Sequence, residues 1–367
     1  MAYQALYRKY RPKTFEDVVG QEHITKTLQN QIKSGQISHA YLFTGTRGTG
    51  KTSVAKIFAK AINCQTASGS PCETCEVCKG LSNPNNLDIL EIDAASNNRV
   101  DEIRDLRENV KFMPTVGKYK VYIIDEVHML TDSAFNALLK TLEEPPEHVV
   151  FILATTEVHK LPATILSRCI RFDFKLIPVG VLANHLKSVF AKEDITCSED
   201  ALKEIALKAE GSCRDMLSIA DCISAYSGKH IEFEDVEKVL GVSDKQTIIA
   251  LADAIISKNI GDCLEIINKL SETGKNIIAF AKDLTVHFRD LLVVKSCKEP
   301  NSILGLPTTV YESYKEQADK AESKTLIEYV KVFSSIEAEL KLTLSPRILL
   351  ETAVLIAISG DEDLKKN

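Results

Sequence analysis

Residues 45–52 read G-T-R-G-T-G-K-T, which fits the phosphate-loop pattern G-x-x-x-x-G-K-[ST]. The glycines allow a tight turn that points successive backbone N–H groups at one phosphate. Lys51 would reach the β- and γ-phosphates of a nucleotide, and the Thr52 hydroxyl would be a ligand of Mg²⁺. A chance glycine turn is the alternative, but an apolar strand before the loop and an apolar helix face after it disfavour that interpretation. The predicted nucleotide-binding residues are Gly45, Thr46, Arg47, Gly48, Thr49, Gly50, Lys51 and Thr52.

Two acids, Asp125 and Glu126, end an apolar run that begins at Lys120. Acids at a strand end are common, but downstream of a phosphate loop they are the pair that nucleotide hydrolysis needs. Asp125 would hold the Mg²⁺ side, and Glu126 would orient and polarise the attacking water. A further run ends in Thr155 and Thr156, in the ligand crevice of a parallel sheet, where they could contact the γ-phosphate or the water.

Four cysteines with the spacing C-x7-C-x2-C-x2-C form a second candidate site. They are Cys64, Cys72, Cys75 and Cys78. Two-residue gaps let neighbouring thiolates converge on one ion, and four thiolates complete a tetrahedral zinc site with no position left for water. We therefore expect a structural Zn²⁺ that stabilises a loop-rich insertion, residues 64–78, the alternative being free surface thiols. The other six cysteines are scattered singly and are expected to be ordinary buried thiols.

The apolar pattern predicts an α/β fold with a parallel sheet, followed by helices. Five apolar runs predict buried strands, at residues 40–44, 87–93, 120–126, 149–154 and 170–174. From Pro178 onward strands disappear and the periodicity is helical, wholly so beyond Val242. Helices this apolar must bury their faces, either in a bundle core or at a subunit interface.

Composition excludes several classes of protein. The chain has 367 residues, enough for two or three domains with separate cores. Its net charge of −6 argues against a surface that coats DNA generally, although a local basic groove remains compatible with it. No run approaches the ~20 apolar residues of a membrane span, and the N-terminus lacks the apolar core of a signal peptide. We expect a cytoplasmic protein that makes no membrane contact.

A basic stripe is a weaker candidate for nucleic-acid contact. A helix capped by Ser96 or Asn97 would carry Arg99, Arg104 and Arg107 beside its buried face. Charge stripes of this kind are usually solvated helix faces. The residues alone therefore favour a solvent-exposed helix face over a DNA-contacting one.

The order of the motifs is that of one known family. The arm R-K-Y-R-P at residues 8–12 precedes the phosphate loop, and the cysteine insertion follows it. D-E-V-H-M-L at 125–130 and F-N-A-L-L-K-T-L-E-E-P-P at 135–146 come next, before S-R-C at 167–169 and G-S-x-R-D at 211–215. This combination closely resembles the γ/τ subunits of the bacterial DNA polymerase III clamp loader, an AAA+ ATPase. The resemblance covers nearly the whole chain, with no departure at the motif positions.

The resemblance implies a P-loop AAA+ core with a zinc module over residues 1–178, a helical lid over 179–242 and an all-α oligomerisation collar over 243–367. The implied function is that of an ATP-driven motor subunit, which opens the sliding clamp and loads it onto primed DNA during chromosome replication. The implied cofactors are ATP, Mg²⁺ and Zn²⁺. The implied partners are δ and δ′ subunits, the β sliding clamp, primer–template DNA, other γ/τ copies and, through the assembly, single-stranded-DNA-binding protein. The family's τ form continues well beyond residue 367, so we expect either a γ-like form or part of a τ.

The resemblance also implies individual roles. Arg168 resembles the arginine finger that reaches the ATP of a neighbouring subunit, Arg214 the lid residue that senses the γ-phosphate, and Thr156 the sensor of the core. The positions at which the family packs adenine correspond to Arg11, Pro12, Val18 and Val19. The DNA-facing helix of the family strengthens the case for three contacts, Asn98, Arg99 and Arg104.

Other function classes fit the sequence less well. A GTPase switch needs a base-reading N-K-x-D, and the nearest approach, N-K-L-S at residues 268–271, lacks the acid. A helicase is suggested by D-E-V-H at residues 125–128, but such helicases carry a second α/β motor domain where this chain is helical. A non-enzymatic scaffold would have a degraded phosphate loop, whereas the key loop residues and both acids are intact here.

Overall fold

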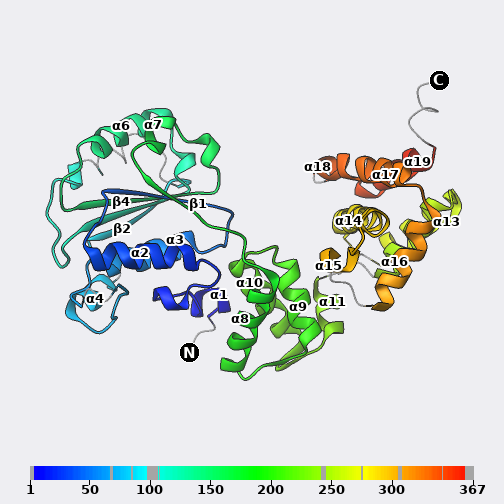
Figure 1. Cartoon of the computed structure of the whole chain (residues 1–367), viewed down its shortest axis with the longest axis horizontal. Helices are drawn as coiled ribbons and strands as arrows, with labels where there is room; N and C mark the ends of the chain where they lie inside the picture. The colour runs from blue at the N-terminus through cyan, green and yellow to red at the C-terminus, as the bar shows by residue number, and fades with distance from the viewer. Residues whose placement is uncertain are drawn as a thin grey trace. The chain divides into compact units, whose positions relative to one another are not determined.

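The computed structural model describes residues 4–66, 69–83, 86–96, 106, 108–240, 245–273, 276–304, 308–340 and 342–359. The chain forms two compact units, Met1–Phe233 and Glu234–Asn367, which are described separately (Figure 1). The predicted division into three domains stays a prediction. Among the described residues, no helix is both long and apolar enough to cross a membrane.

The first unit is built on a five-stranded, wholly parallel sheet with the strand order β2-β3-β4-β1-β5. The strands are β1 (Ala40–Thr44), β2 (Ile89–Asp93), β3 (Lys120–Asp125), β4 (Val149–Thr155) and β5 (Ile170–Asp173). Every residue of β1 and β4 is buried, as predicted from their apolar runs. Parallel strands end at one edge of the sheet, and the registers pair Thr44 with Thr155 and Asp93 with Asp125. The acidic and hydroxyl side chains are thereby gathered at that edge.

The predicted second strand begins two residues late. We expected it from Leu87, but that side chain is 62% exposed and the strand starts at Ile89. The side chain of Asn86 accepts hydrogen bonds from the backbone N–H groups of Asp88 and Ile89, at 3.1 and 2.7 Å. A turn held by the Asn86 side chain therefore precedes the hydrogen-bonded strand.

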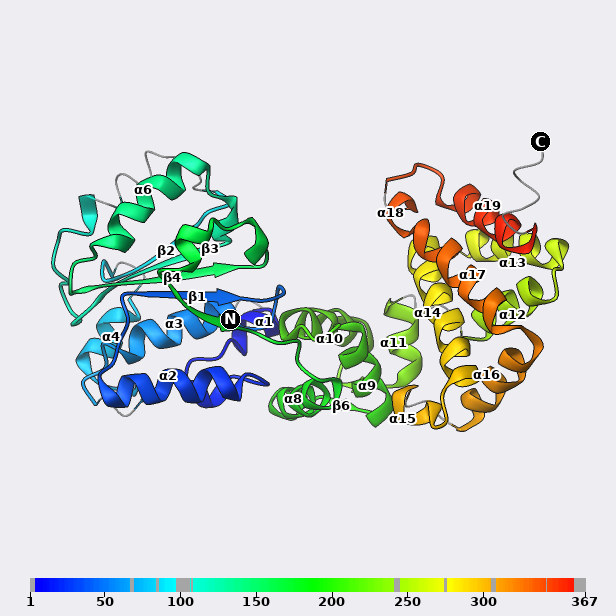
Figure 2. The ribbon, with the colours of Figure 1, turned by 45° about the horizontal axis from the view of Figure 1, so that its top comes forward.

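Helices cover both faces of the sheet because its side chains alternate between them (Figure 2). On one face, α2 (Glu22–Ser34) and α3 (Lys51–Ala61) pack against a core that includes Tyr41 and Phe43 of β1. On the other face, α6 (Asp132–Glu143) and α7 (Ala163–Leu166) pack around Leu42. The sandwich holds α3, and so the loop before it, against the sheet.

The rest of this unit is mainly helical and carries the segment at the start of the chain. The main helices are α8 (Val179–Lys192), α9 (Glu199–Lys208) and α10 (Cys213–Ser227). The short helix α1 (Leu6–Lys9) packs on α10, and the Leu6 N–H donates to Asp221 at 2.7 Å. The prediction that strands end at Pro178 was wrong, because β6 (Thr196–Cys197) and β7 (His230–Ile231) pair in parallel. Two-residue strands are too short to show an alternating pattern in the sequence.

Within its described residues the second unit is all-helical, as predicted beyond Val242. Its helices are α11 (Phe233–Leu240), α12 (Lys245–Ile256), α13 (Ile260–Glu272), α14 (Ile277–Ser296), α15 (Pro300–Leu304), α16 (Thr308–Lys320), α17 (Ser323–Ser335), α18 (Glu337–Leu340) and α19 (Pro346–Ser359). The central helix is α14, whose buried apolar side chains pack against α17. Phe288 and Phe333 stack there with their ring centres 5.6 Å apart.

Candidate functional site

The predicted phosphate loop leads from β1 into α3 with the backbone conformation that the motif requires. Gly48 has φ +78°, and a Cβ at that position would come within 1.9 Å of the Ser212 hydroxyl. Gly45 has φ +141°, and its Cβ would meet the Phe174 carbonyl at 2.5 Å. Only glycine satisfies both the positive φ and the close approach. The loop is therefore held between β5 and the start of α10.

Lys51 lies inside this loop and is only 6% exposed. Its ammonium donates to the carbonyls of Gly45 and Thr46, at 2.8 and 2.9 Å. Burial lowers the pKa of Lys51, and the nearby carboxylates of Glu126 and Asp125 act in the opposite direction. A partly desolvated cation inside a glycine-rich loop is suited to bind an anionic phosphate.

The two predicted magnesium ligands are in direct contact. The Thr52 hydroxyl at the start of α3 donates to Asp125 Oδ2 at the end of β3, at 2.6 Å. The two residues are far apart in sequence, and the order of the strands brings them together. A hydroxyl and a carboxylate are both oxygen ligands, the kind that Mg²⁺ prefers. This pair therefore fits a magnesium site beside the phosphate loop.

Glu126 is held by Thr156, the residue that directly follows the neighbouring strand β4, and by His128. It has φ +47°, an unusual conformation for a residue with a side chain. The Thr156 hydroxyl donates to Glu126 Oε2 at 3.1 Å, so the two predicted catalytic residues meet. His128, which sequence reasoning did not select, lies 3.0 Å from Thr155 Oγ1 and 3.1 Å from Glu157 Oε2. The orientation of Glu126 is thus set by Thr156, just after β4, and by His128, which Thr155 and Glu157 hold in turn.

A cavity of about 550 Å³ opens over the phosphate loop. It is lined by the loop from Arg47 to Thr52, by both acids, and by the four predicted adenine-side residues, Arg11, Pro12, Val18 and Val19. Sequence reasoning missed further lining residues, Tyr7, Tyr10, Ile177, His185, Cys213 and Leu217. They come from the N-terminal segment and from the part of the chain after β5, and although Tyr10 and Cys213 lie within quoted motifs, the sequence did not indicate that they face the nucleotide. The cavity has the size of a small-molecule site.

Two predicted arginines line this cavity from different elements. Arg214 opens α10, and its guanidinium carbon lies 5.5 Å from the ring centre of Tyr7. Arg11 donates from Nε to Ser53 Oγ at 3.1 Å, which ties the N-terminal segment to α3. Both cations therefore face the same cavity as Lys51, which makes its interior suited to a polyanion.

Arg168 is not among the residues that line the cavity. Its guanidinium donates to Glu143 Oε1 and to the Thr164 carbonyl, each at 2.8 Å. The Arg168 side chain is 32% exposed and that of Glu143 50%, so this is a surface ion pair. A role for Arg168 toward a neighbouring subunit stays a prediction.

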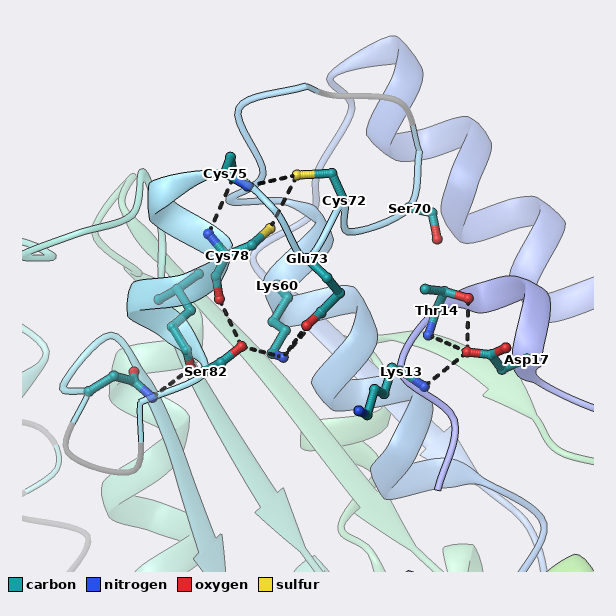
Figure 3. A network of polar contacts seen from close by, with 12 residues as sticks. Lys13, Thr14, Asp17, Lys60, Ser70, Cys72, Glu73, Cys75, Cys78 and Ser82 are labelled. Atoms are coloured by element: carbon teal, nitrogen blue, oxygen red, sulfur yellow. Dashed lines mark hydrogen bonds and ion pairs between the residues drawn. The ribbon is translucent and has the colours of Figure 1, made fainter. Parts of the chain in front are cut away.

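The four cysteines converge as their spacing predicts, and their sulfur atoms all lie within 4.8 Å of one another. Figure 3 shows three of them, Cys72, Cys75 and Cys78. The N–H of Cys75 donates to Cys72 Sγ and the N–H of Cys78 to Cys75 Sγ, both at 3.3 Å. A hydrogen bond from the Thr74 side chain, with further backbone N–H donors, lowers the pKa of Cys72 to about 5. Tetrahedral Zn–S bonds of ~2.3 Å place sulfurs ~3.8 Å apart, so the cluster fits zinc.

The three predicted DNA contacts, Asn98, Arg99 and Arg104, lie outside the described residues. Their role stays a prediction.

Three protein-family models match consecutive parts of the chain. The model described as DNA polymerase III, delta subunit, matches residues 20–178. The ATPase lid domain of the DNA polymerase III clamp loader subunit matches residues 181–229. Domain III of DNA polymerase III subunits gamma and tau matches residues 231–365.

Curated relatives match over the same extent. DNA polymerase III subunit tau of Bacillus subtilis is 49% identical over 97% of this chain and 63% of its own length. DNA polymerase III subunit gamma of Buchnera aphidicola is 38% identical over 98% of this chain and its own full length. The chain thus spans less than two thirds of the B. subtilis tau. Among solved structures, the Thermotoga maritima RuvB Holliday junction branch migration motor has a TM-score of 0.48 and 20% identity, covering 84% of this chain and 91% of its own.

Proposed function

Since the chain belongs to the family of γ and τ subunits of DNA polymerase III, we propose that it is a Mg²⁺-dependent ATPase that drives clamp loading. The observation that supports this most strongly is that the phosphate loop, the end of β3 and the residue after β4 meet at one edge of the sheet. Thr52 contacts Asp125 at 2.6 Å, and Thr156 contacts Glu126 at 3.1 Å, beside a loop that encloses Lys51. These are the groups that bind a triphosphate, hold its metal and activate water.

Each of these residues has a distinct proposed task. Lys51 exchanges its two carbonyl partners for the β- and γ-phosphates of ATP, and the loop N–H groups bind the remaining phosphate oxygens. Thr52 and Asp125 hold Mg²⁺, which neutralises charge on the phosphates. Glu126, oriented by Thr156, accepts the proton of the attacking water.

The remaining cavity walls select the rest of the nucleotide. The apolar side chains of Val18 and Val19, with Pro12 and the stem of Arg11, provide the adenine side. Arg214 at the start of α10 senses the γ-phosphate, so that nucleotide binding draws the helices after β5 toward the loop. The four cysteines hold a structural Zn²⁺.

The assembly is part of the same proposal and rests on family membership. The chain would work with δ and δ′ subunits and further γ/τ copies. It would act on the β sliding clamp and primer–template DNA, with single-stranded-DNA-binding protein contacted through the assembly. Asn98, Arg99 and Arg104 are the proposed DNA contacts, Arg168 is the proposed arginine finger, and the cytoplasm is the proposed location.

Two substitutions at the site test the proposed ATPase. Lys51→Ala should weaken ATP binding at least tenfold, because one charge-assisted hydrogen bond contributes about 1.5–3 kcal/mol. Glu126→Gln should leave ATP affinity unchanged and lower hydrolysis by about 10²–10⁴, because only the proton acceptor is lost. Nucleotide titration and phosphate release measure the two effects, on the chain alone and with δ, δ′, clamp and primed DNA.

A matched control is available on the same helix. Lys56 of α3 is partly exposed and pairs with Glu91 outside the cavity, so Lys56→Ala should bind and hydrolyse ATP normally. Equal loss of binding in Lys51→Ala and Glu126→Gln would mean that Glu126 holds the metal or the fold. Hydrolysis that clamp and primed DNA fail to stimulate would contradict the clamp-loading part of the proposal.

A further inference from the structure

The loop between Cys64 and Cys72 contacts the N-terminal segment of the chain. The Ser70 hydroxyl donates to Glu16 Oε2 at 2.8 Å and accepts a hydrogen bond from the Phe15 N–H at 3.3 Å. Gln29 of α2 donates to the other oxygen of Glu16 at 2.9 Å. A residue of the cysteine insertion is therefore bonded to both the backbone and a side chain of residues 15–16.

The contacted segment is a rigid turn. The Asp17 carboxylate accepts hydrogen bonds from the Thr14 N–H, the Thr14 hydroxyl and the Lys13 N–H, at 3.1, 3.0 and 3.3 Å. Phe15 is only 3% exposed and belongs to the core on the α2 and α3 side of the sheet. Figure 3 shows Ser70 beside this turn. A displacement of Ser70 would therefore move the turn as a unit.

The same turn leads directly into the nucleotide cavity. Asp17, Val18 and Val19 all line that cavity, whereas neither Ser70 nor Glu16 does. The partners of Ser70, Phe15 and Glu16, directly precede these three residues, which form one wall of the cavity. Ser70 itself lies outside the cavity lining. Its influence on the cavity must act through the position of the turn.

The cysteine insertion is also anchored to the helix that follows the phosphate loop. Cys64 comes just after α3, and Lys60 of that helix contacts Glu73 at 3.2 Å and Ser82 at 2.8 Å (Figure 3). Lys60 lies near the C-terminal end of α3, nine residues beyond Lys51, and does not line the cavity. The contact of the insertion with the cavity wall therefore runs through the turn that precedes Val18 and not through the phosphate loop.

We propose that the cysteine insertion is a positioning element of the nucleotide site, which holds the Asp17–Val19 wall in place through the hydrogen bonds of Ser70. Filling of the four-cysteine site and affinity for the nucleoside part of the nucleotide are then coupled. This inference rests on the proposed nucleotide binding. Ser70 is a positioning residue and not a catalytic one, because it contacts Phe15 and Glu16, next to the wall, and does not line the cavity.

The test compares two serines near the cysteines. Ser70→Ala removes the contact with the turn. Ser82→Ala is the matched control, because Ser82 bonds to the Cys78 carbonyl and to Lys60 at the end of α3 that lies away from the cavity. Affinities for ATP and for inorganic tripolyphosphate are measured by titration, and zinc content by metal analysis. Loss of one or two ordinary hydrogen bonds predicts about a 3- to 10-fold weaker affinity for ATP in Ser70→Ala. Tripolyphosphate affinity should not change, since it has no nucleoside to contact the wall.

A second variant approaches the same contact from the other side. Glu16→Ala leaves every residue of the insertion intact and should reproduce the selective loss of ATP affinity at full zinc content. If Ser70→Ala loses its zinc, the ATP affinity of Glu16→Ala decides whether the contact positions the wall. Removal of zinc from the wild-type chain by a chelator should likewise weaken ATP more than tripolyphosphate.

The inference is overturned if Glu16→Ala and Ser70→Ala bind ATP as tightly as Ser82→Ala, or if both ligands weaken equally. That result differs from failure of the proposed function, in which the wild-type chain would bind neither ATP nor tripolyphosphate.

Discussion

The strongest functional prediction concerns Arg168, which is bonded within its own chain. Its guanidinium contacts Glu143 and the Thr164 carbonyl, both at 2.8 Å, outside the nucleotide cavity. If Arg168 acts on the nucleotide of a neighbouring subunit, it must leave these partners when the assembly forms. The cost of leaving them decides whether that role is feasible.

The free energies involved favour release of Arg168 from these partners. The ion pair with Glu143 lies at the surface, so it contributes about 0.2–1 kcal/mol, and the hydrogen bonds to the Thr164 carbonyl and the Ser167 hydroxyl contribute about 1 kcal/mol each. An arginine finger contributes about 10³–10⁵ in rate, or about 4–7 kcal/mol of transition-state stabilisation. The gain in the assembly therefore exceeds the cost in the isolated chain.

We expect Arg168→Ala to leave ATP binding by the isolated chain unchanged and to lower DNA-stimulated hydrolysis in the assembly by about 10³-fold or more. Glu143→Ala should change the same rate by less than about tenfold, since it only frees the guanidinium. Arg171→Ala is the matched control, because Arg171 is a nearby exposed arginine that pairs with Asp173 at 2.7 Å. Phosphate release with δ, δ′, clamp and primed DNA measures all three.

A mixing experiment separates action between subunits from action within one. Arg168→Ala chains and Lys51→Ala chains are combined at several ratios in one assembly. Recovery of activity is expected wherever an intact phosphate loop lies beside an intact arginine. No recovery at any ratio, together with weaker ATP binding by Arg168→Ala alone, would refute the reasoning and assign Arg168 to its own subunit.

Three further predictions concern stability and metal. Burial lowers the pKa of His287 to about 4 from 6.5, so the unfolded chain takes up the proton first. The free energy of unfolding of the second unit should be highest above pH 6.5 and fall by about 3 kcal/mol towards pH 4. Chemical denaturation of His287→Asn should not show this pH dependence. Asp88→Asn should cost about 3 kcal/mol by chemical denaturation, since the buried carboxylate accepts bonds from Thr115, Val116 and Gly117 at 2.6–3.0 Å. A stability equal to wild type would contradict that account. Metal analysis should find about one zinc per chain and less in Cys72→Ser, and four freely reactive thiols without metal would contradict the site.

The residues predicted to form the chemical site are mostly those whose spacing along the chain already carries the geometry. The phosphate loop needs only eight consecutive residues between a strand and a helix, and the structure has β1 and α3 in those places. The cysteines converge because two-residue gaps and a short loop limit how far their sulfurs can separate. Local covalent connectivity determines both arrangements, so they can be derived before the fold is known.

Residues that act through distant partners could not be found this way. His128 lies within the D-E-V-H-M-L motif, but the motif does not indicate its partners, and its contacts with Thr155 and Glu157 exist only because β3 and β4 are neighbours. His287 is an unremarkable helix residue until Gln317, thirty positions later, bonds to its ring at 2.7 Å. A lone histidine in a sequence gives no sign of either environment.

The sequence by itself determined the parallel sheet, the loop, the acids and the cysteine cluster, because apolar periodicity and short spacings encode them. Only the tertiary structure decided that Ser70 meets Glu16 and that Tyr7 lies beneath Arg214. Those pairs are separated by 54 and 207 positions, and nothing in the intervening chain fixes their distance. They meet because burying the two faces of the sheet and the helices after it leaves one compact arrangement, in which the chain's first residues close the cavity that its phosphate loop begins.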